Sequence, residues 1–175
     1  MQVERIAELD LTPGDEAAIA DLLRRCFATD FGGRSHFIQR HHLRFVLRDP
    51  AIVGHMGLTF RVVRLGGALV PVLGLADVAT DPGRRGEGIA ARLLAEVIAW
   101  GRTSPADVLL LFGTAALYQG AGCRKAANPM RYVDMTGAVT HGVRDEPAES
   151  LMVLPLKPGA AWDETLPLDL LGHLF

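Results

Sequence analysis

The segment Asp81-Pro82-Gly83-Arg84-Arg85-Gly86-Glu87-Gly88-Ile89-Ala90 is the most informative part of the sequence, because it connects an expected strand to the clearest helix of the chain. Its small residues allow a ligand to approach the backbone closely. The unpaired N–H groups and the dipole of the following helix form an anion site, to which Arg84 and Arg85 add positive charge. The segment is therefore suited to bind a diphosphate or a polyphosphate.

Two other phosphate-binding motifs fit this segment less well. A nucleoside-triphosphate P-loop requires Lys and then Ser or Thr after its last glycine, and neither follows here. Gly86, Gly88 and Ala91 match the G-x-G-x-x-A pattern of dinucleotide-binding domains. That pattern should follow an early strand, and an acidic residue should stand at the end of a strand about 20 residues later. The nearest candidate, Asp107, precedes its strand instead. An NAD site is therefore the weaker alternative.

The segment lies between a strand expected over Ala68–Thr80 and a helix expected over Gly88–Arg102. Pro71 and Gly74 within the strand predict a bulge or a break in its pairing. The continuous apolar run Val108–Phe112 predicts a strand that is buried on both faces. The helix is predicted from apolar residues at helical spacing, namely Ile89, Leu93, Leu94, Val97 and Trp100.

The other elements are predicted from periodicity and turn residues. Gly66-Gly67 predicts a tight hairpin, Gly137–Glu149 reads as a polar loop, and the apolar tail Leu166–Phe175 is expected to pack on the domain or on a second subunit. Strands are expected over Val3–Leu9, Leu43–Leu47, Ala51–Leu65, Arg131–Met135 and Leu151–Leu156, a helix from Thr12-Pro13 to near Asp30, and short helices over Arg34–His41 and Ala115–Ala121.

Composition limits the class of protein. The 175 residues, 49% of them hydrophobic, predict a single domain over residues 1–175 with a sizeable core. A net charge of −2 gives no general basic field, so nucleic acid is not expected as a partner. No apolar run approaches the roughly 20 residues of a membrane span, and no secretory signal is recognised, so no membrane partner is expected.

Cysteine and histidine positions argue against a disulfide scaffold and a metal site. Cys26 and Cys123 lie far apart, which favours a reducing, cytoplasmic location. His36, His41 and His42 do not have a spacing that would put three ligands on one face, so no metal is expected.

Two motifs and the order of the elements carry a resemblance to a known family. A strand, then Asp-Pro, then R-x-x-G-x-A (Arg85, Gly88, Ala90) opening a helix resembles motif A of the GCN5-related N-acetyltransferase (GNAT) superfamily. Tyr118-Gln119-Gly120-Ala121-Gly122-Cys123 is similar to the later Tyr-x-x-x-Gly-aromatic element of that family. The expected order of strands and helices also matches. A narrower likeness connects scattered short stretches, such as His55-Met56-Gly57-Leu58, to the rhizobial nodulation N-acyltransferases.

The resemblance implies an α/β (α+β) fold with a mixed, mostly antiparallel central sheet flanked by helices, and with strands that splay at the coenzyme A site. It implies acetyl-CoA, or another acyl-CoA, as co-substrate. The backbone of the splayed strand would contact the pantetheine arm and bind the oxyanion, and the loop would hold the pyrophosphate. The implied coenzyme-binding residues are Val78, Ala79, Thr80, Arg84, Arg85, Gly86, Glu87, Gly88, Ile89 and Ala90.

The resemblance also suggests catalytic groups. Tyr118 stands where the family has a general acid near the coenzyme sulfur, although a tyrosine that only packs a short helix has the same sequence signature. Several relatives have a Glu where this chain has Ala76, so the general base cannot be transferred from them. Asp77 is the nearest acid and is a candidate base or amine anchor, with an ordered water chain or a structural carboxylate as alternatives. His55 could line the acceptor site or be a hydrogen-bonded core histidine.

Three functions remain open from the sequence. The first is an N-acetyltransferase that moves an acetyl group directly to a primary amine of a small molecule or peptide. The second is a fatty-acyl N-acyltransferase of the nodulation type. The third is a non-catalytic acyl-CoA-binding protein, which stays open because Ala76 stands where several relatives have a Glu. A homodimer is possible in each case.

Overall fold

The computed structural model describes residues 2–175, and these form two compact units. The N-terminal unit holds the chain up to Thr59 together with Ala76–Val97, and the C-terminal unit holds Phe60–Leu75 and the chain from Ile98 onward. The expectation of one domain over residues 1–175 stays a prediction. Within residues 2–175, no helix combines the length and the apolar character needed to span a membrane.

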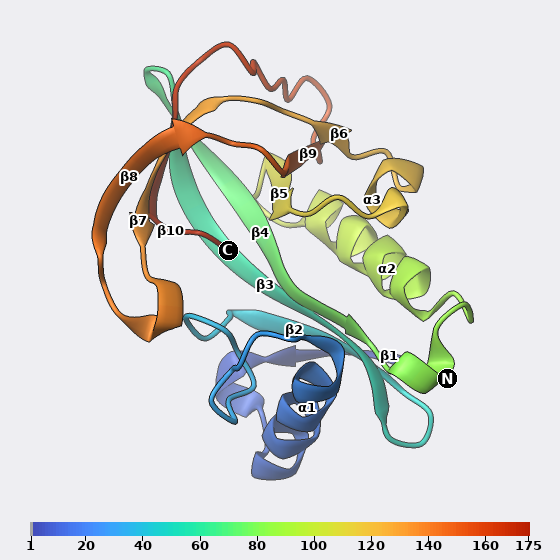
Figure 1. The fold of residues 1–175 in the computed structure, drawn as a ribbon. Coiled ribbons are helices and arrows are strands. Elements are labelled where there is room, and N and C mark those ends of the chain that lie inside the picture. Colours follow the sequence, from blue (N-terminus) through green and yellow to red (C-terminus); the bar gives the residue numbers. More distant parts are fainter. Residues whose placement is uncertain (1) are drawn as a thin grey trace. The chain divides into compact units, whose positions relative to one another are not determined.

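Strands of the N-terminal unit pair in an antiparallel manner. β1 (Gln2–Ala7) pairs with β2 (Leu43–Arg48), and β2 pairs with the first part of β3 (Ile52–Leu65) (Figure 1). A short 3-10 turn, η1 (Glu8–Asp10), follows β1 and leads to α1 (Pro13–Cys26). These positions agree with the expected strands to within a few residues.

Helix α1 begins and packs as its sequence predicts. The Thr12 side chain accepts a hydrogen bond from the Asp15 N–H, and Pro13 occupies the first turn. The helix ends at Cys26, earlier than the expected end near Asp30. Its apolar face belongs to the core cluster of this unit, made by Ile19, Leu22, Leu23, Phe31, Val46, Ile52 and Ala79.

The short helix expected over Arg34–His41 is wrong, because this segment consists of bends and irregular backbone. Its backbone groups bond to side chains instead of to carbonyls one helical turn away. The Phe37 N–H donates to the Asp77 carboxylate, and the Phe37 carbonyl accepts from the Arg34 guanidinium. The Ser35 carbonyl likewise accepts from Arg44. The segment is therefore held by tertiary contacts that helical periodicity cannot reveal.

The C-terminal unit contains the rest of the sheet, in the strand order β6-β9-β5-β4-β3-β10-β7-β8. β4–β5 and β10–β7 pair in parallel, and the ladders of β5–β9, β6–β9, β7–β8 and β10–β3 are antiparallel. The expected mixed, mostly antiparallel sheet is thereby confirmed. The bounds are β4 (Ala68–Thr80), β5 (Val108–Phe112), β6 (Arg124–Lys125), β7 (Pro129–Asp134), β8 (Gly142–Pro147), β9 (Leu151–Pro155) and β10 (Leu168–His173).

The structure corrects one expectation for the second half of the chain and agrees with one of the two alternatives for the tail. The polar loop expected over Gly137–Glu149 contains a 3-10 turn, η3 (Thr136–Ala138), and the strand β8. Every residue of β8 is exposed, and among the described strands β8 pairs with β7 alone. The strand therefore lacks the apolar alternation that marks a half-buried strand. The tail packs on its own unit as β10, which lies between β3 and β7.

β4 is also more regular than expected. Residues Val72–Leu75 pair with β5 in unbroken register, so Pro71 and Gly74 do not interrupt the strand. A Cβ atom at position 74 would collide with the ring of Phe175, so Gly74 makes room for the C-terminal aromatic side chain. The irregular residue of β4 is Asp77, whose backbone φ is +49°.

Candidate functional site

The loop after β4 is ordered by its own side chains. Asp81 caps the 3-10 turn η2 (Pro82–Arg84) by accepting a hydrogen bond from the Gly83 N–H at 2.9 Å. Gly86 and Gly88 have φ values of +87° and +77°, which side chains other than glycine rarely adopt. Apart from its own chain neighbours, no atom of residues 2–175 lies within 4 Å of a Cβ atom built on either glycine, so the backbone of the loop is open to a ligand.

Helix α2 (Ile89–Thr103) begins directly after Gly88 and packs closely on β3. A Cβ atom at Gly54 would lie 2.6 Å from the Ile89 side chain and 2.8 Å from that of Leu93. Only glycine therefore allows the first turns of α2 to approach the strand this closely. The helix presents its free N–H groups to the loop, as the sequence predicts, but the supporting role of Gly54 was not predicted.

The two loop arginines differ in their partners. Arg84 forms ion pairs with Glu87 at 2.7 Å and with Asp49 at 3.0 Å, and these carboxylates raise the pKa of Arg84 above its usual value. The Arg84 guanidinium in turn lowers the pKa of Glu87. Arg85 makes no ion pair within residues 2–175. Arg84 and Glu87 therefore shape the loop, and Arg85 keeps its charge available for an anion.

The last residues of β4 lead from Asp77 into this loop. Ala79 is buried in the core cluster of the N-terminal unit, and the Thr80 carbonyl accepts a hydrogen bond from the Cys26 thiol at 3.2 Å. Val78 is half-buried. Contact of Val78, Ala79 and Thr80 with a pantetheine arm stays a prediction.

The carboxylate of Asp77 is buried and lies within hydrogen-bond distance of two nitrogen atoms. Its Oδ2 atom lies 2.8 Å from His41 Nε2 and 3.2 Å from the Phe37 amide nitrogen. Burial by itself would raise the pKa of Asp77, but the hydrogen bond and charge of His41 outweigh it, and the pKa lies below its usual value. The carboxylate is therefore ionised at neutral pH.

His55 fixes the backbone of Asp77. The ring is fully buried, with Nδ1 at 2.8 Å from the Asp77 carbonyl oxygen and Nε2 at 3.3 Å from the guanidinium of Arg44. A guanidinium can only donate, so Nε2 accepts and the Nδ1–H donates to the carbonyl. Burial, followed by the nearby Arg44 charge, lowers the pKa of His55 to about 3. Of the two roles considered for His55, the structure supports the hydrogen-bonded core histidine.

Arg44 is itself fully buried and paired. Its guanidinium makes two hydrogen bonds to the Glu8 carboxylate, at 2.7 and 2.9 Å. Burial acts to raise the pKa of Glu8, but the bonds to Arg44 outweigh it and the pKa is lowered. Such a buried pair is strongly destabilising to break, because one charge would be left alone. Sequence reasoning missed it, because nothing local relates positions 8 and 44.

His41 has one nitrogen paired and the other free. Its ring lies against Gly57, where a Cβ atom would collide with it, and Nε2 faces the Asp77 carboxylate. Nδ1 is buried and has no hydrogen-bond partner within residues 2–175. The Asp77 carboxylate thereby fixes the orientation of the His41 ring, as an aspartate does for a catalytic histidine, and Nδ1 is the ring nitrogen that the contact leaves unused.

From the sequence, His41 was considered as a metal ligand, a role that its spacing from His36 and His42 does not favour. Among residues 2–175, no group of three or more His, Cys, Asp or Glu side chains is placed to hold a metal ion. The pairing of His41 with Asp77 joins positions 36 residues apart, and the sequence contains no signal for it.

Tyr118 lies in the C-terminal unit, on α3 (Ala116–Gly120), and is buried. Its ring contacts Gly113, where a Cβ atom would come within 3.0 Å. Burial, and then the neighbouring Cys123, raises the pKa of the Tyr118 phenol, so it is protonated at neutral pH. The buried Cys123 thiol also has a raised pKa, as expected for a packing residue. The role of Tyr118 as an acid stays a prediction.

Comparisons with known proteins agree on one family. The family model described as an acetyltransferase (GNAT) domain matches residues 10–126. A GNAT N-acetyltransferase (YhbS) from Escherichia coli in complex with CoA is 21% identical, with a TM-score of 0.66 over 97% of this chain and 88% of that one. A GNAT acetyltransferase from Brucella melitensis in complex with acetyl-CoA is 22% identical, with a TM-score of 0.57 over 90% of each chain.

The ribosomal-protein-S18-alanine N-acetyltransferase from E. coli is 16% identical, with a TM-score of 0.59 over 93% of this chain and all of that one. Comparison with curated proteins finds no match. At these identities the structural likeness establishes the fold, and the family model establishes the family. The narrower likeness to the nodulation acyltransferases finds no support among these matches and stays a prediction. The chain belongs to the GNAT acetyltransferase family, whose members are acyltransferases.

Proposed function

We propose that the protein transfers an acetyl group from acetyl-CoA directly to a primary amine of a small molecule or peptide. The observation that carries this proposal is the glycine loop at the start of α2. An open backbone, the N–H groups of the helix and the Arg85 side chain meet there, and the chain belongs to the GNAT family. Two structures of similar fold contain CoA or acetyl-CoA. The loop would hold the pyrophosphate, and Val78–Thr80 would contact the pantetheine arm.

The Asp77–His41 pair supplies the proton acceptor that the alanine at position 76 leaves missing. An alkylamine with a pKa of about 10.4 is mostly protonated at neutral pH, and freeing its lone pair costs roughly 4–5 kcal/mol. His41 Nδ1 is buried, so it would take that proton through a bound water rather than directly from the ammonium group. Asp77 orients the ring and stabilises the imidazolium that forms.

The remaining steps follow direct transfer. The amine nitrogen attacks the thioester carbonyl carbon, and the backbone N–H near Val78 stabilises the resulting oxyanion. The C–S bond then breaks, and the Tyr118 phenol donates its proton to the leaving thiolate. The amide nitrogen loses its second proton to solvent, Tyr118 regains a proton from solvent, and His41 releases to solvent the proton that it took from the amine. The products are the acetylated amine and free CoA.

Calorimetric titration with acetyl-CoA and then with longer acyl-CoAs tests the donor. We expect one site per chain and a preference for acetyl-CoA. Preference for a long chain would favour the fatty-acyl alternative. Binding without CoA release across a panel of amines, followed with a thiol reagent, would favour the non-catalytic alternative. No binding of any acyl-CoA would contradict the assignment of the loop.

Loop variants locate the bound coenzyme. Arg85→Ala removes the free charge and should weaken acetyl-CoA binding about tenfold. Gly88→Asp should weaken it further, because it adds a negative charge and strains a backbone at φ +77°. Arg102→Ala, which removes an exposed charge from the last turn of the same helix, is the matched control. Unchanged titrations for both loop variants would contradict the proposed site.

A further inference from the structure

The outer face of the sheet in the C-terminal unit carries a row of charges. Asp169 on β10 pairs in register with Arg64 on β3 and with Arg131 on β7, and Arg131 pairs with Asp145 on β8. Residues directly opposite each other in a sheet point to the same face. The four side chains therefore form one row across four strands, and their signs alternate as plus, minus, plus, minus.

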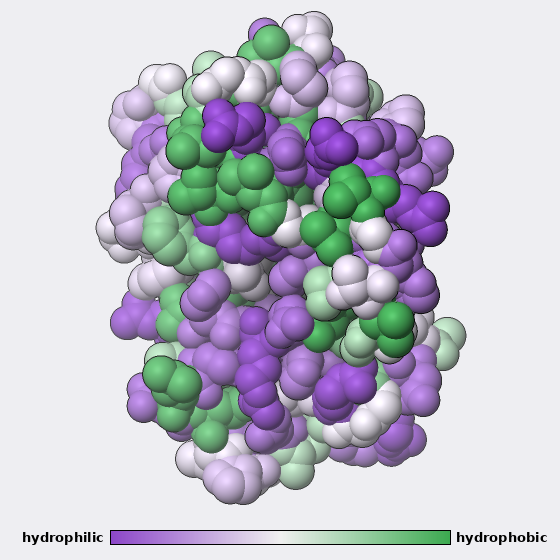
Figure 2. Space-filling model, turned by 90° about the vertical axis from the view of Figure 1, so that its left-hand side faces the viewer, coloured by the Kyte–Doolittle hydropathy of each residue, from purple (hydrophilic) through white to green (hydrophobic). Residues whose placement is uncertain are grey.

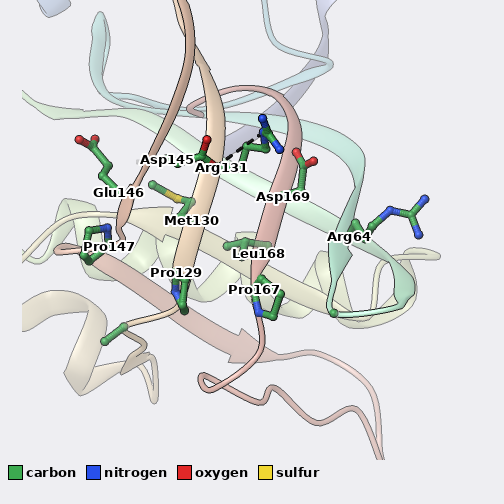
Figure 3. Close-up of a pocket in the computed structure, with 12 residues that line it drawn as sticks. Arg64, Pro129, Met130, Arg131, Asp145, Glu146, Pro147, Pro167, Leu168 and Asp169 are labelled. Carbon is green, nitrogen blue, oxygen red and sulfur yellow. Dashed lines mark ion pairs between the residues drawn. The ribbon is translucent and has the colours of Figure 1, made fainter.

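Apolar groups flank this row on both sides. On one side, the adjacent row is made by Gly66, Pro167, Pro129 and Pro147, and it borders a hollow of about 540 Å³ that the charged residues also line (Figure 3). The same unit also exposes the large apolar side chains Phe60, Val62, Val143 and Leu171, which are 40–56% exposed. Seen from the side on which β8 lies in Figure 1, the surface carries several separate groups of apolar side chains with polar side chains between them (Figure 2).

The charges in the row are only partly neutralised. Arg131 and Asp145 lie 3.6 Å apart, and both side chains are more than half exposed. Arg64 makes no ion pair within residues 2–175, and Asp169 accepts only the N–H of Leu171 within the same stretch of chain. The row therefore keeps unused charge of both signs at positions set by the register of the sheet.

We infer that this face binds a second copy of the chain, with the two sheets facing each other across a two-fold axis that runs parallel to the strands. An axis placed between β10 and β7 sets Arg64 opposite the partner's Asp145, and Arg131 opposite the partner's Asp169. Every charge in the row then meets an opposite charge. The apolar rows meet their own copies, as an isologous interface requires.

The hollow and the size of the face fit this arrangement. The hollow gives the partner's arginine side chains room to reach Asp145 and Asp169 without separating the two sheets. Four strands about 4.8 Å apart and about seven residues long give a face of roughly 20 by 23 Å. Two such faces amount to about 900 Å², which is less than a stable interface buries, so the dimer is expected to be weak and to depend on concentration.

A second copy explains the alternation better than a small ligand does. None of the four charged residues is fully buried, so the hollow lacks the desolvated polar group that orients a small molecule. A row that alternates in sign also has no net charge with which to attract a simple anion or cation. It is complementary to itself.

Sedimentation velocity from about 1 to about 200 µM tests the proposal, and we expect a monomer–dimer equilibrium within that range. Arg131→Asp and Asp169→Arg each place like charges opposite each other twice in the dimer, and each should weaken dimerisation at least about tenfold. The double variant Arg131→Asp/Asp169→Arg keeps the row self-complementary and should restore it. Arg102→Asp, an exposed arginine on α2, is the control for charge alone.

Thermal melts and acetyl-CoA titrations of the same variants confirm that each is folded. Only the oligomeric state should change, so failure of this proposal is distinguishable from failure of the proposed function. A chain that stays monomeric at about 200 µM overturns the proposal. A dimer that is insensitive to both single charge reversals, or one that the double variant fails to restore, also overturns it.

Discussion

Asp77 concentrates the local strain of the candidate site. A residue other than glycine in the left-handed region costs about 1–2 kcal/mol, and Asp77 has a φ of +49°. His55 holds its carbonyl and His41 holds its carboxylate, at 2.8 Å in each case. Strain that surrounding contacts maintain in this way is characteristic of functional positions. The strand thereby turns a carboxylate towards His41 directly before the residues proposed to bind coenzyme.

Replacing either member of the Asp77–His41 pair should slow the chemical step. Asp77→Asn and His41→Ala are expected to lower kcat about 10²–10⁴-fold with an amine acceptor, because a positioned base contributes that much. Acetyl-CoA affinity should remain within about twofold, since neither side chain belongs to the loop. Steady-state kinetics and calorimetry measure the two quantities separately. Added imidazole should partly restore His41→Ala, which a purely structural histidine would not show.

Gly57 and His42 provide matched controls for that experiment. Gly57→Ala keeps the imidazole but pushes its ring away from Asp77, so it should lose kcat nearly as strongly as His41→Ala. His42→Ala alters the exposed neighbouring histidine and should retain the wild-type rate. Full activity in Gly57→Ala, with a correctly folded protein, would show that the position of the His41 ring is irrelevant to the reaction.

His55 should make the protein less stable in mild acid. The folded state keeps this ring neutral down to its pKa of about 3, whereas the unfolded chain binds a proton near 6.5. The unfolded state therefore gains protons first, and stability that is full above pH 6.5 falls as the pH decreases towards 3. Between pH 7 and pH 5 the expected loss is about 2 kcal/mol, measurable by urea unfolding at each pH.

The variant His55→Asn isolates this contribution. Asparagine keeps an N–H donor for the Asp77 carbonyl but does not titrate, so the difference in unfolding free energy between pH 7 and pH 5 should shrink by about 2 kcal/mol. An unchanged pH dependence in His55→Asn would assign the acid sensitivity to other groups.

At the scale of elements, local patterns predicted the β4–loop–α2 unit well. Its glycines, its arginines and the apolar spacing of α2 all lie within one short stretch of sequence, and the structure agrees with them closely. The helix expected over Arg34–His41 fails because its backbone bonds to Arg34, Arg44 and Asp77 side chains. Periodicity reports which face of an element is buried, and cannot report bonds to distant side chains.

The contact of α2 with β3 predicts the effect of filling the gap at Gly54. Gly54→Ala places a methyl group 2.6 Å from Ile89, so α2 must shift and stability should fall by about 1–3 kcal/mol. Because the shifted turn is the one that follows Gly88, acetyl-CoA binding should weaken as well. Urea unfolding and calorimetry check both effects. Gly67→Ala, at a turn with open space around it, should change neither.

At the scale of the whole molecule, the parts that sequence reasoning missed are those set by long-range pairing. The Glu8–Arg44 and His41–Asp77 pairs each join positions 36 residues apart, and β10 inserts between two strands that are distant in sequence. Their partners are chosen by the sheet, and no local motif encodes that choice. The resemblance to a family predicted the sheet class and the loop because a family resemblance draws on a complete fold rather than on a local pattern.

The C-terminal residue of the chain packs against the middle of β4, and this predicts a strong coupling. A Cβ atom at Gly74 would collide with the Phe175 ring, over which the Arg61 guanidinium lies 4.7 Å from the ring centre. Gly74→Ala should therefore cost about 1–3 kcal/mol by overpacking. In a Phe175→Ala background the added methyl group finds the space that the ring leaves, so the same change should cost about nothing or stabilise.

A double-mutant cycle measured by urea unfolding gives the coupling directly, with an expected magnitude of at least about 1 kcal/mol. Additive effects of the two substitutions would mean that Phe175 does not occupy this place in solution. A large coupling would show that the tail closes the C-terminal unit over Gly74, and it would explain why a glycine is tolerated inside a regularly paired strand, where it otherwise lowers stability.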